Sequence, residues 1–360
     1  MGVLLVNMTM IDGTLFSGAE YIDGGLSALV QKGIHLFAVG KFYSLFSMLF
    51  GLGFYYFMNK DDGTLVKKPL FKRRLAALFV FGLLHLIFVW NGDILHVYAL
   101  TGLFLLFNTE TSPQKLVKMA LLLFVVSTAM FVLLQSGSDS DINVYDKVIK
   151  EATNVYSKGS YLEVVTYRVT KELPLIAINF LFVLPKILSL FFLGYAIGKK
   201  QIFNALDAHK KLIHRTWLLT GLLSLTTGAA TTLDFVMSMD FNMVILLDEV
   251  LTVTGALFYA TSLIKLYDTK IGKRLLTPLK YAGQMALTNY LTQTIVMSVF
   301  FYGYGFGQFE KLPYWSYIPM MLTLYGIQLI ISSYWMKRHR FGPMEKVWRT
   351  LTYGKSHLKA

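Results

Sequence analysis

Long apolar runs separated by short basic clusters are the feature that most constrains how this chain can fold. A membrane-spanning helix needs about 20 mostly apolar residues at a rise of about 1.5 Å each. The chain supplies many such runs, for example Leu173 to Ala196, Trp217 to Met237 and Met243 to Leu266. Charged residues make up only 15% of the sequence, against about 25% in soluble domains. The pattern predicts an all-α, polytopic transmembrane helical bundle.

Hydropathy places about ten spans along the chain. They are expected near residues 1–9, 38–58, 73–90, 94–107, 115–135, 174–197, 215–237, 243–266, 281–303 and 316–336. The first is incomplete, because the residues from Met1 to Met8 are too few to cross the hydrocarbon and carry no basic flank. We therefore expect the first helix to be truncated.

The distribution of basic residues predicts the orientation. If the first helix runs outward, the inner segments are 59–74, 108–118, 199–215, 265–280 and 337–360. These segments hold 6, 2, 5, 5 and 7 lysines and arginines, which is 25 of the 34 in the chain. Basic residues concentrate in cytoplasmic loops. The sequence thus predicts a multi-pass membrane protein with a cytoplasmic C-terminus.

No linker rich in proline, glycine or serine divides the sequence into halves. Residues 1–360 are therefore expected to form a single integral membrane domain. Apolar residues at helical spacing in 136–172 predict an extracytoplasmic amphipathic insertion. Residues 10–37 are expected to form an outer connection with a short interfacial helix, and 337–360 a cytoplasmic basic tail.

Several classes of protein are disfavoured. The chain has no cysteine, which excludes disulfides and thiolate chemistry. With seven histidines and no cysteine, we expect no dedicated metal site. No P-loop, Gly-x-Gly-x-x-Gly or Gly-x-Ser-x-Gly motif is present. Because the basic residues lie at helix ends, the expected partner is the lipid bilayer rather than nucleic acid. The oligomeric state stays open, with a homo-oligomer as one expectation.

The strongest candidate for chemistry is the tight turn between the third and fourth spans. Asn91-Gly92-Asp93 is a turn signal, His85 lies about two turns before it, and His96 follows about one turn later. A histidine oriented by a carboxylate is a common general-base pair. The alternatives are that Asp93 only caps the fourth helix and that each histidine only bonds to a backbone carbonyl.

Other polar residues fall within apolar runs, where they tend to face a cavity or a partner. Lys41 opens a stretch rich in glycine and serine, where it either snorkels or binds an anionic group. Lys186 can pair with the acids Asp248, Glu249 and Asp234 or line a path for protons or substrate. The predicted substrate-binding residues are Lys41, Trp90, Asn91, His96, Glu249, Asn289 and Gln293. For Asn289 and Gln293 the alternative is interhelical hydrogen bonding.

Three segments carry a resemblance to a known family. They are His85 to Gly102, with its Trp-Asn-Gly-Asp-Ile-Leu, Gly283 to Thr294, with Met-Ala-Leu-Thr-Asn-Tyr, and Phe341 to Thr352, which begins Phe-Gly-Pro-Met-Glu-Lys. Together they resemble the signatures of the YeiB-like family of bacterial membrane proteins, domain-of-unknown-function family 418. Members usually begin with Leu-Asp-x-x-Arg-Gly and a first helix that ends Leu-Leu-x-Asn. Here only Leu4-Leu5-Val6-Asn7 remains, in keeping with truncation.

That family is distantly similar to transmembrane acyltransferases, which move an acyl group from a cytoplasmic thioester to an acceptor across the membrane. The similarity implies a catalytic set of His85 as base, Asp93 as its partner and Asn7 near the acyl carbonyl. Acyl-CoA is the implied donor, and its phosphates would be held by Lys72, Arg73 and Arg74. The implied acceptor is a small molecule or a glycan.

Two other functions compete with acyl transfer. A small-solute or proton-coupled transporter would use Lys186, Asp234, Asp248 and Glu249 as a polar path. The absence of a visible internal repeat disfavours a repeat-built transporter. A non-catalytic membrane protein would need none of the polar groups to converge.

Overall fold

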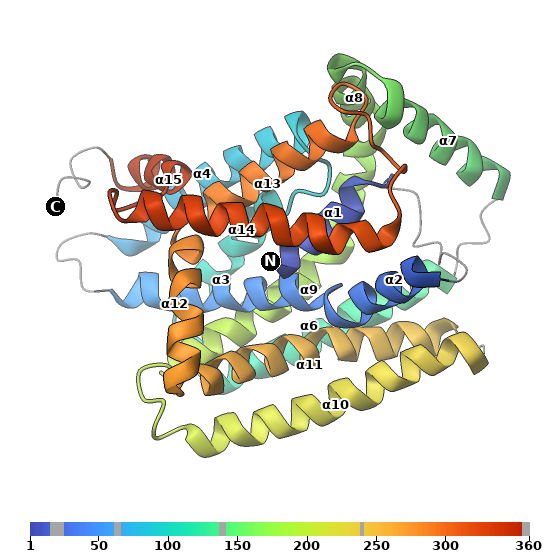
Figure 1. The fold of residues 1–360 in the computed structure, drawn as a ribbon. Coiled ribbons are helices and arrows are strands. Elements are labelled where there is room, and N and C mark those ends of the chain that lie inside the picture. Colours follow the sequence, from blue (N-terminus) through green and yellow to red (C-terminus); the bar gives the residue numbers. More distant parts are fainter. Residues whose placement is uncertain (15–24, 61–65, 137–141, 238–240, 355–360) are drawn as a thin grey trace.

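The computed structural model describes residues 1–14, 25–60, 66–136, 142–237 and 241–354, and in these ranges it contains helices and no strand (Figure 1). The α-helices are α1 (Gly2–Ile11), α2 (Gly25–Phe37), α3 (Lys41–Asn59), α4 (Lys67–Phe88), α5 (Leu95–Leu106), α6 (Pro113–Ser136), α7 (Ile142–Lys158), α8 (Tyr161–Tyr167), α9 (Leu173–Lys199), α10 (Lys210–Met237), α11 (Phe241–Tyr267), α12 (Lys270–Gln284), α13 (Ala286–Phe301), α14 (Tyr317–Met336) and α15 (Pro343–Tyr353). A π-helix, η1, spans Arg168–Glu172, and a 3-10 turn, η2, spans Tyr314–Ser316. The predicted all-α class is confirmed.

Five helical segments of the described chain are long and apolar enough to cross a membrane. They are Gly25–Asn59, Pro113–Leu133, Tyr161–Lys199, Asn242–Tyr267 and Tyr314–Met336. Two shorter helices, Gly2–Ile11 and Leu95–Leu106, are also strongly apolar. Many large apolar side chains on these helices are exposed, as expected where lipid rather than water surrounds the protein. The chain is a helical membrane protein.

The centre of the bundle is the contact between α3 and α9. A Cβ atom on Gly51 would lie 2.0 Å from the Phe191 carbonyl oxygen, and one on Gly194 would lie 1.8 Å from the Met48 carbonyl oxygen. The two backbones therefore touch, which only glycine allows at these positions. The ring of Phe50 stacks on Phe191 at 4.5 Å. Gly51 of the Lys41 stretch thus serves close helix packing.

The other helices pack around this pair. α6 lies along α9, α4 pairs with α5, and α10 pairs with α11 on the outside of the bundle (Figure 1). α1 packs on α13, α14 and α3. A second apolar core forms where α1, α13, α14 and the α7–α8 region meet, with Met8, Phe301 and Tyr156 almost fully buried.

The predicted span over 281–303 is interrupted at Met285. Residues up to Gln284 belong to α12, which crosses the direction of the neighbouring helices, and α13 begins only at Ala286 (Figure 1). The break has a clear physical cause, because the Glu345 carboxylate accepts hydrogen bonds from the backbone N–H groups of Leu287 and Thr288 at 2.7 and 3.0 Å. An acidic group at this place starts a new helix.

The two ends of the bundle differ in charge. Figure 1 shows α12, α15 and the starts of α4 and α10 at one end, and α2, α7 and α8 at the other. The first group carries the basic clusters at 67–74, 210–215, 270–280 and 337–349. A helix occupies 25–37, as the sequence predicts, whereas residues 137–141 of the predicted insertion over 136–172 lie outside the described residues.

Candidate functional site

The turn between α4 and α5 brings together the candidate residues nearest in sequence. Asp93 Oδ2 accepts the backbone N–H of His96 at 2.9 Å, so this carboxylate caps the start of α5. A Cβ atom on Gly82 of α4 would lie 2.3 Å from the His96 backbone nitrogen. α4 and α5 therefore meet backbone to backbone at Gly82, which places both histidines beside one carboxylate.

Both histidine side chains bind Asp93. His85 Nδ1 donates to Oδ1 at 2.9 Å, and His96 Nδ1 donates to Oδ2 at 2.7 Å. The side chains of His85 and Asp93 are 1% and 0% exposed. Capping and histidine binding are thus combined in one residue rather than being alternatives. A carboxylate that holds Nδ1–H leaves Nε2 of the neutral ring as the basic atom.

The basic atom of His85 meets α13. The hydroxyl of Thr294 lies 2.7 Å from His85 Nε2, and the Tyr290 ring centre lies 5.2 Å from that of His85. Thr294 is fully buried. The hydroxyl group therefore occupies the position at which a general base would receive a proton from an alcohol. Thr294 is the last residue of the second resemblance segment but was not among the predicted site residues.

A second polar layer covers the turn from the α8 side. Asn91 Nδ2 donates to Glu172 Oε2 at 2.8 Å, and the Tyr156 hydroxyl donates to the same oxygen at 2.7 Å. Arg168 Nη1 donates to the Ile87 carbonyl at 2.9 Å. Trp90, in the same turn, is 2% exposed and lies in the second apolar core.

Arg168 and Glu172 were missed by sequence reasoning. They are 1% and 0% exposed and bound the π-helix η1, a form that often marks functional sites. Arg168 Nε and Nη2 and Glu172 Oε1 have no hydrogen-bond partner in the described part of the chain. The available signal was an arginine and a glutamate four residues apart at the edge of the longest apolar run.

Lys41 and Glu249 lie in a separate charged cluster formed by α2, α3, α9 and α11. Lys186 Nζ donates to Glu249 Oε1 at 2.5 Å, and His35 Nε2 lies 3.5 Å from Asp248 Oδ2. Lys41 is 2% exposed and donates to the His35 carbonyl at 3.1 Å. The pairing of Lys186 with an acid occurs as the sequence suggested, and the side chain of Asp234 lies outside the described residues.

Asn289 and Gln293 hold α13 against α14. Gln293 Nε2 donates to Gln328 Oε1 at 2.5 Å, and Asn289 Nδ2 donates to Ser332 Oγ at 3.1 Å. Glu345 of α15 also accepts from the Thr288 hydroxyl at 2.5 Å. α13 therefore joins the three resemblance segments, because it bonds to His85 on one side and to Glu345 on another.

The remaining predicted residues lie on α1 and near the start of α4. Asn7 is buried on α1, which packs on α13. Lys72 and Arg73 are exposed on the first turns of α4, whereas the Arg74 guanidinium stacks 3.7 Å above the Trp348 ring of α15. Of the three predicted phosphate-binding residues, Arg74 thus has an intramolecular partner.

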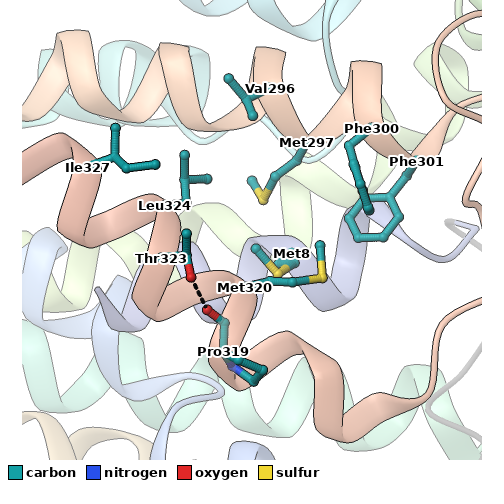
Figure 2. Close-up of a pocket in the computed structure, with 10 residues that line it drawn as sticks. All are labelled: Met8, Val296, Met297, Phe300, Phe301, Pro319, Met320, Thr323, Leu324 and Ile327. Atoms are coloured by element: carbon teal, nitrogen blue, oxygen red, sulfur yellow. Dashed lines mark hydrogen bonds between the residues drawn. The ribbon is translucent and has the colours of Figure 1, made fainter.

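An apolar groove of about 390 Å³ lies between α13 and α14, with Met8 of α1 among its lining residues (Figure 2). Met297, Phe300, Met320 and Leu324 line it, and none of the predicted site residues does. No group of three histidine or acidic side chains in the described ranges is placed to hold a metal ion.

Comparison with known proteins finds one matching family and several similar proteins. Residues 197–355 match the family described as "Protein of unknown function (DUF418)". The uncharacterized protein YxaH of Bacillus subtilis is 29% identical over 326 residues, covering 86% of this chain and 78% of the relative. An uncharacterized 39.9 kDa protein from the amylase 3' region of Bacillus acidopullulyticus is 29% identical over 99% of this chain and 91% of its own length.

The uncharacterized protein YeiB of Escherichia coli is 25% identical over 345 residues, covering 87% of this chain and 81% of the relative. No solved structure matches the chain. The DUF418 match and the similarity to YxaH and YeiB support the resemblance of the three segments to the YeiB-like DUF418 family.

Proposed function

We propose that this protein is a membrane-bound acyltransferase in which His85 is the general base. The observation that carries the proposal is the buried chain Asp93–His85–Thr294, in which a carboxylate holds Nδ1–H and a hydroxyl meets Nε2. An acceptor hydroxyl that replaced the Thr294 hydroxyl at Nε2 would be placed for deprotonation.

The reaction balances with one acyl thioester and one acceptor. Nε2 of His85 takes the proton of the acceptor hydroxyl, whose oxygen attacks the thioester carbonyl. The C–S bond breaks as the ester C–O bond forms, and the imidazolium returns the proton to the departing thiolate. Asp93 stabilises the imidazolium. We assign Asn7, on the neighbouring helix α1, to the developing negative charge on the acyl oxygen.

The proposed donor is acyl-CoA, approached from the basic end of the bundle. Lys72 and Arg73 are exposed there and free to meet its phosphates, whereas Arg74 would act through its stacking on Trp348. The proposed acceptor is a small molecule or glycan with several hydroxyl groups. The unpartnered donors of Arg168 and the unpartnered Glu172 Oε1 support this choice, because a polyol supplies both acceptors and donors.

The proposed topology has α1, α3, α4, α5, α6, α9, α10, α11, α13 and α14 as ten spans, with the C-terminus in the cytoplasm of the inner membrane. The basic residues at the end of the bundle formed by α12 and α15 support it. Since the chain lacks cysteine, single-cysteine variants test it. Asn154→Cys should react with an impermeant maleimide in intact cells, and Asn204→Cys only after permeabilisation. The reverse result would contradict the orientation.

The acyltransferase proposal is tested by the thermal stability of the purified protein with acetyl-CoA. At a concentration 100 times Kd, binding stabilises a protein by about 2.7 kcal/mol. The Lys72→Ala/Arg73→Ala variant should lose most of that shift, and the matched Lys210→Ala/Lys211→Ala variant should keep it. His85→Gln should bind acetyl-CoA but not release free CoA in the presence of acceptor. No shift for the unaltered protein would overturn the proposal.

A transporter is the second candidate, favoured by the buried cluster of Lys41, Lys186, Asp248 and Glu249. Two of its carboxylate oxygens, Asp248 Oδ1 and Glu249 Oε2, have no partner in the described residues, and buried ionisable groups in membrane proteins often mark ion or substrate paths. Proton uptake by proteoliposomes that depends on Glu249, without any acetyl-CoA shift, would favour transport.

A further inference from the structure

Helix α12 (Lys270–Gln284) lies across the basic end of the bundle. Figure 1 shows its axis roughly perpendicular to those of α11 and α14, both of which are long and apolar enough to cross a membrane. Thr269 caps its start, accepting the Gly272 N–H at 2.9 Å. A helix perpendicular to the spans at one end of them runs parallel to the membrane plane.

One face of α12 is apolar and only half covered by protein. Gly272 and Ala282 are buried and Leu276 is half-buried against the bundle. On the same apolar arc, at successive intervals of four residues, Ile271, Leu275 and Leu279 are 73%, 62% and 38% exposed. Water around these three side chains would be unfavourable, at about 25 cal/mol for each Å² of apolar surface.

The opposite face is basic. Lys270, Lys273, Arg274 and Lys280 are all exposed, and the segment 270–284 contains no acidic residue. α11, which leads into α12, also exposes Leu263 and Leu266 in its last turns. The exposed apolar surface of a membrane-crossing helix thus continues into the apolar arc of α12, while the cations point to the other side.

We propose that α12 is an interfacial helix that binds anionic phospholipids at the basic end of the bundle. Ile271, Leu275 and Leu279 enter the acyl-chain region, and the four cations meet lipid headgroups at the surface. An amphipathic helix with apolar residues on one face and lysines or arginines on the other binds membrane surfaces in this way. Basic residues near an anionic membrane surface are attracted to it electrostatically. The inference does not depend on acyl transfer.

Depth measurements test where the apolar arc lies. Spin labels on Leu275→Cys and on Thr277→Cys, which is on the basic face, are placed in vesicles of phosphatidylcholine and phosphatidylglycerol. The label at 275 should be accessible to oxygen and shielded from a water-soluble nickel chelate, and the label at 277 the reverse. Equal access of nickel to both positions would overturn the proposal and leave a soluble partner as the occupant.

Thermal stability in nanodiscs tests the choice of lipid. Replacing phosphatidylcholine discs with discs that contain phosphatidylglycerol should raise the Tm of the unaltered protein by several degrees. The Lys270→Gln/Lys273→Gln/Arg274→Gln/Lys280→Gln variant should lose most of that rise. The control Lys147→Gln/Lys150→Gln/Lys158→Gln, on α7 at the other end, should retain it. Inorganic phosphate with phosphatidylcholine discs should not reproduce the rise, and an equal response of both variants would contradict the assignment.

Discussion

Two groups of buried ionisable side chains in this protein are built in different ways. In the turn between α4 and α5, Asp93 is eight residues from His85 and three from His96, and both of its oxygens accept hydrogen bonds. The Lys186–Glu249 pair joins helices 63 residues apart. In that cluster Asp248 Oδ1 and Glu249 Oε2 have no partner in the described residues.

The difference is instructive for function. The tight turn fixes the geometry of the Asp93 site without a contribution from α13. Preorganised catalysis requires a geometry of this kind. The Lys186 cluster depends on the separate positions of α2, α3, α9 and α11, so a movement of any of these helices changes its pairing. The first arrangement suits chemistry at a fixed point, and the second suits a site whose partners change.

The largest effect is expected from Asp93→Ala, which leaves two buried histidines without their shared acceptor. A buried donor left without an acceptor costs about 1–3 kcal/mol, and here two imidazole N–H groups and the backbone N–H of His96 lose theirs. Unfolding by SDS titration of the protein in mixed micelles measures the loss. Asp93→Asn, which can still cap α5, should lose less. A loss below about 1 kcal/mol for the alanine variant would mean that the site is not a rigid unit.

A smaller effect is expected from Lys186→Met, because it removes one partner from one carboxylate, whereas Asp93→Ala removes the acceptor of two histidines. An unsatisfied buried partner costs about 1–3 kcal/mol. The double variant Lys186→Met/Glu249→Gln should recover much of that loss, and Lys171→Met, an exposed lysine, serves as control. If the double variant is less stable than the single one, the cluster is as rigid as the Asp93 site.

Glu345→Gln tests the cap that separates α12 from α13. The amide keeps an acceptor for the Leu287 and Thr288 N–H groups but loses the charge, so a loss of about 1 kcal/mol is expected. Circular dichroism melting in detergent can detect it, with Lys346→Gln as the neighbouring control. An unchanged melting curve would show that α13 starts at Ala286 for another reason.

A further effect concerns pH and a third carboxylate, Asp12, which follows α1. It accepts hydrogen bonds from the Glu310 N–H at 2.6 Å and the Tyr317 hydroxyl at 2.5 Å. Burial raises its pKa from 3.8 to about 7, against the opposing effect of these bonds. The folded state therefore holds the proton more tightly than the unfolded state. This contribution to stability is complete below pH 4 and is lost as the pH rises through 7.

The check on Asp12 is a series of Tm values between pH 5 and pH 8. The unaltered protein should lose stability over this range, and Asp12→Asn should have a flatter profile. If Tm falls with pH equally in the unaltered protein and in Asp12→Asn, the Asp12 carboxylate is as well stabilised by its two donors as Asp93 is by its two histidines.

Much of the fold was predictable because hydropathy reports burial in lipid directly. The all-α class and most helices follow from the apolar runs. The break at Met285 was not predictable, since it depends on Glu345, which is 58 residues from Leu287 in the sequence. The glycines of α3 gave only part of the evidence for its close approach to α9. The contact also needs Gly194 of α9 to face α3, and the sequence does not show which residues of α9 do so.

For the site, local sequence was enough to place His85, Asp93 and His96 together, because a turn of a few residues permits few geometries. The role of Arg168 was not predicted, because its side chain bonds to the Ile87 carbonyl, which is 81 residues earlier in the sequence. Asn289 and Gln293 were recognised as polar residues in an apolar run, but their partners on α14 could not be read from the sequence.

By itself, the sequence determined that this is a helical membrane protein and that most of its basic residues lie between the apolar runs, since both features depend only on the preference of each residue for water or lipid. The tertiary structure alone decided that Thr294 meets His85 across 209 residues, that Glu345 starts α13, and that α12 lies across the spans. The physical reason is that such contacts depend on the crossing of whole helices, which many distant side chains fix together.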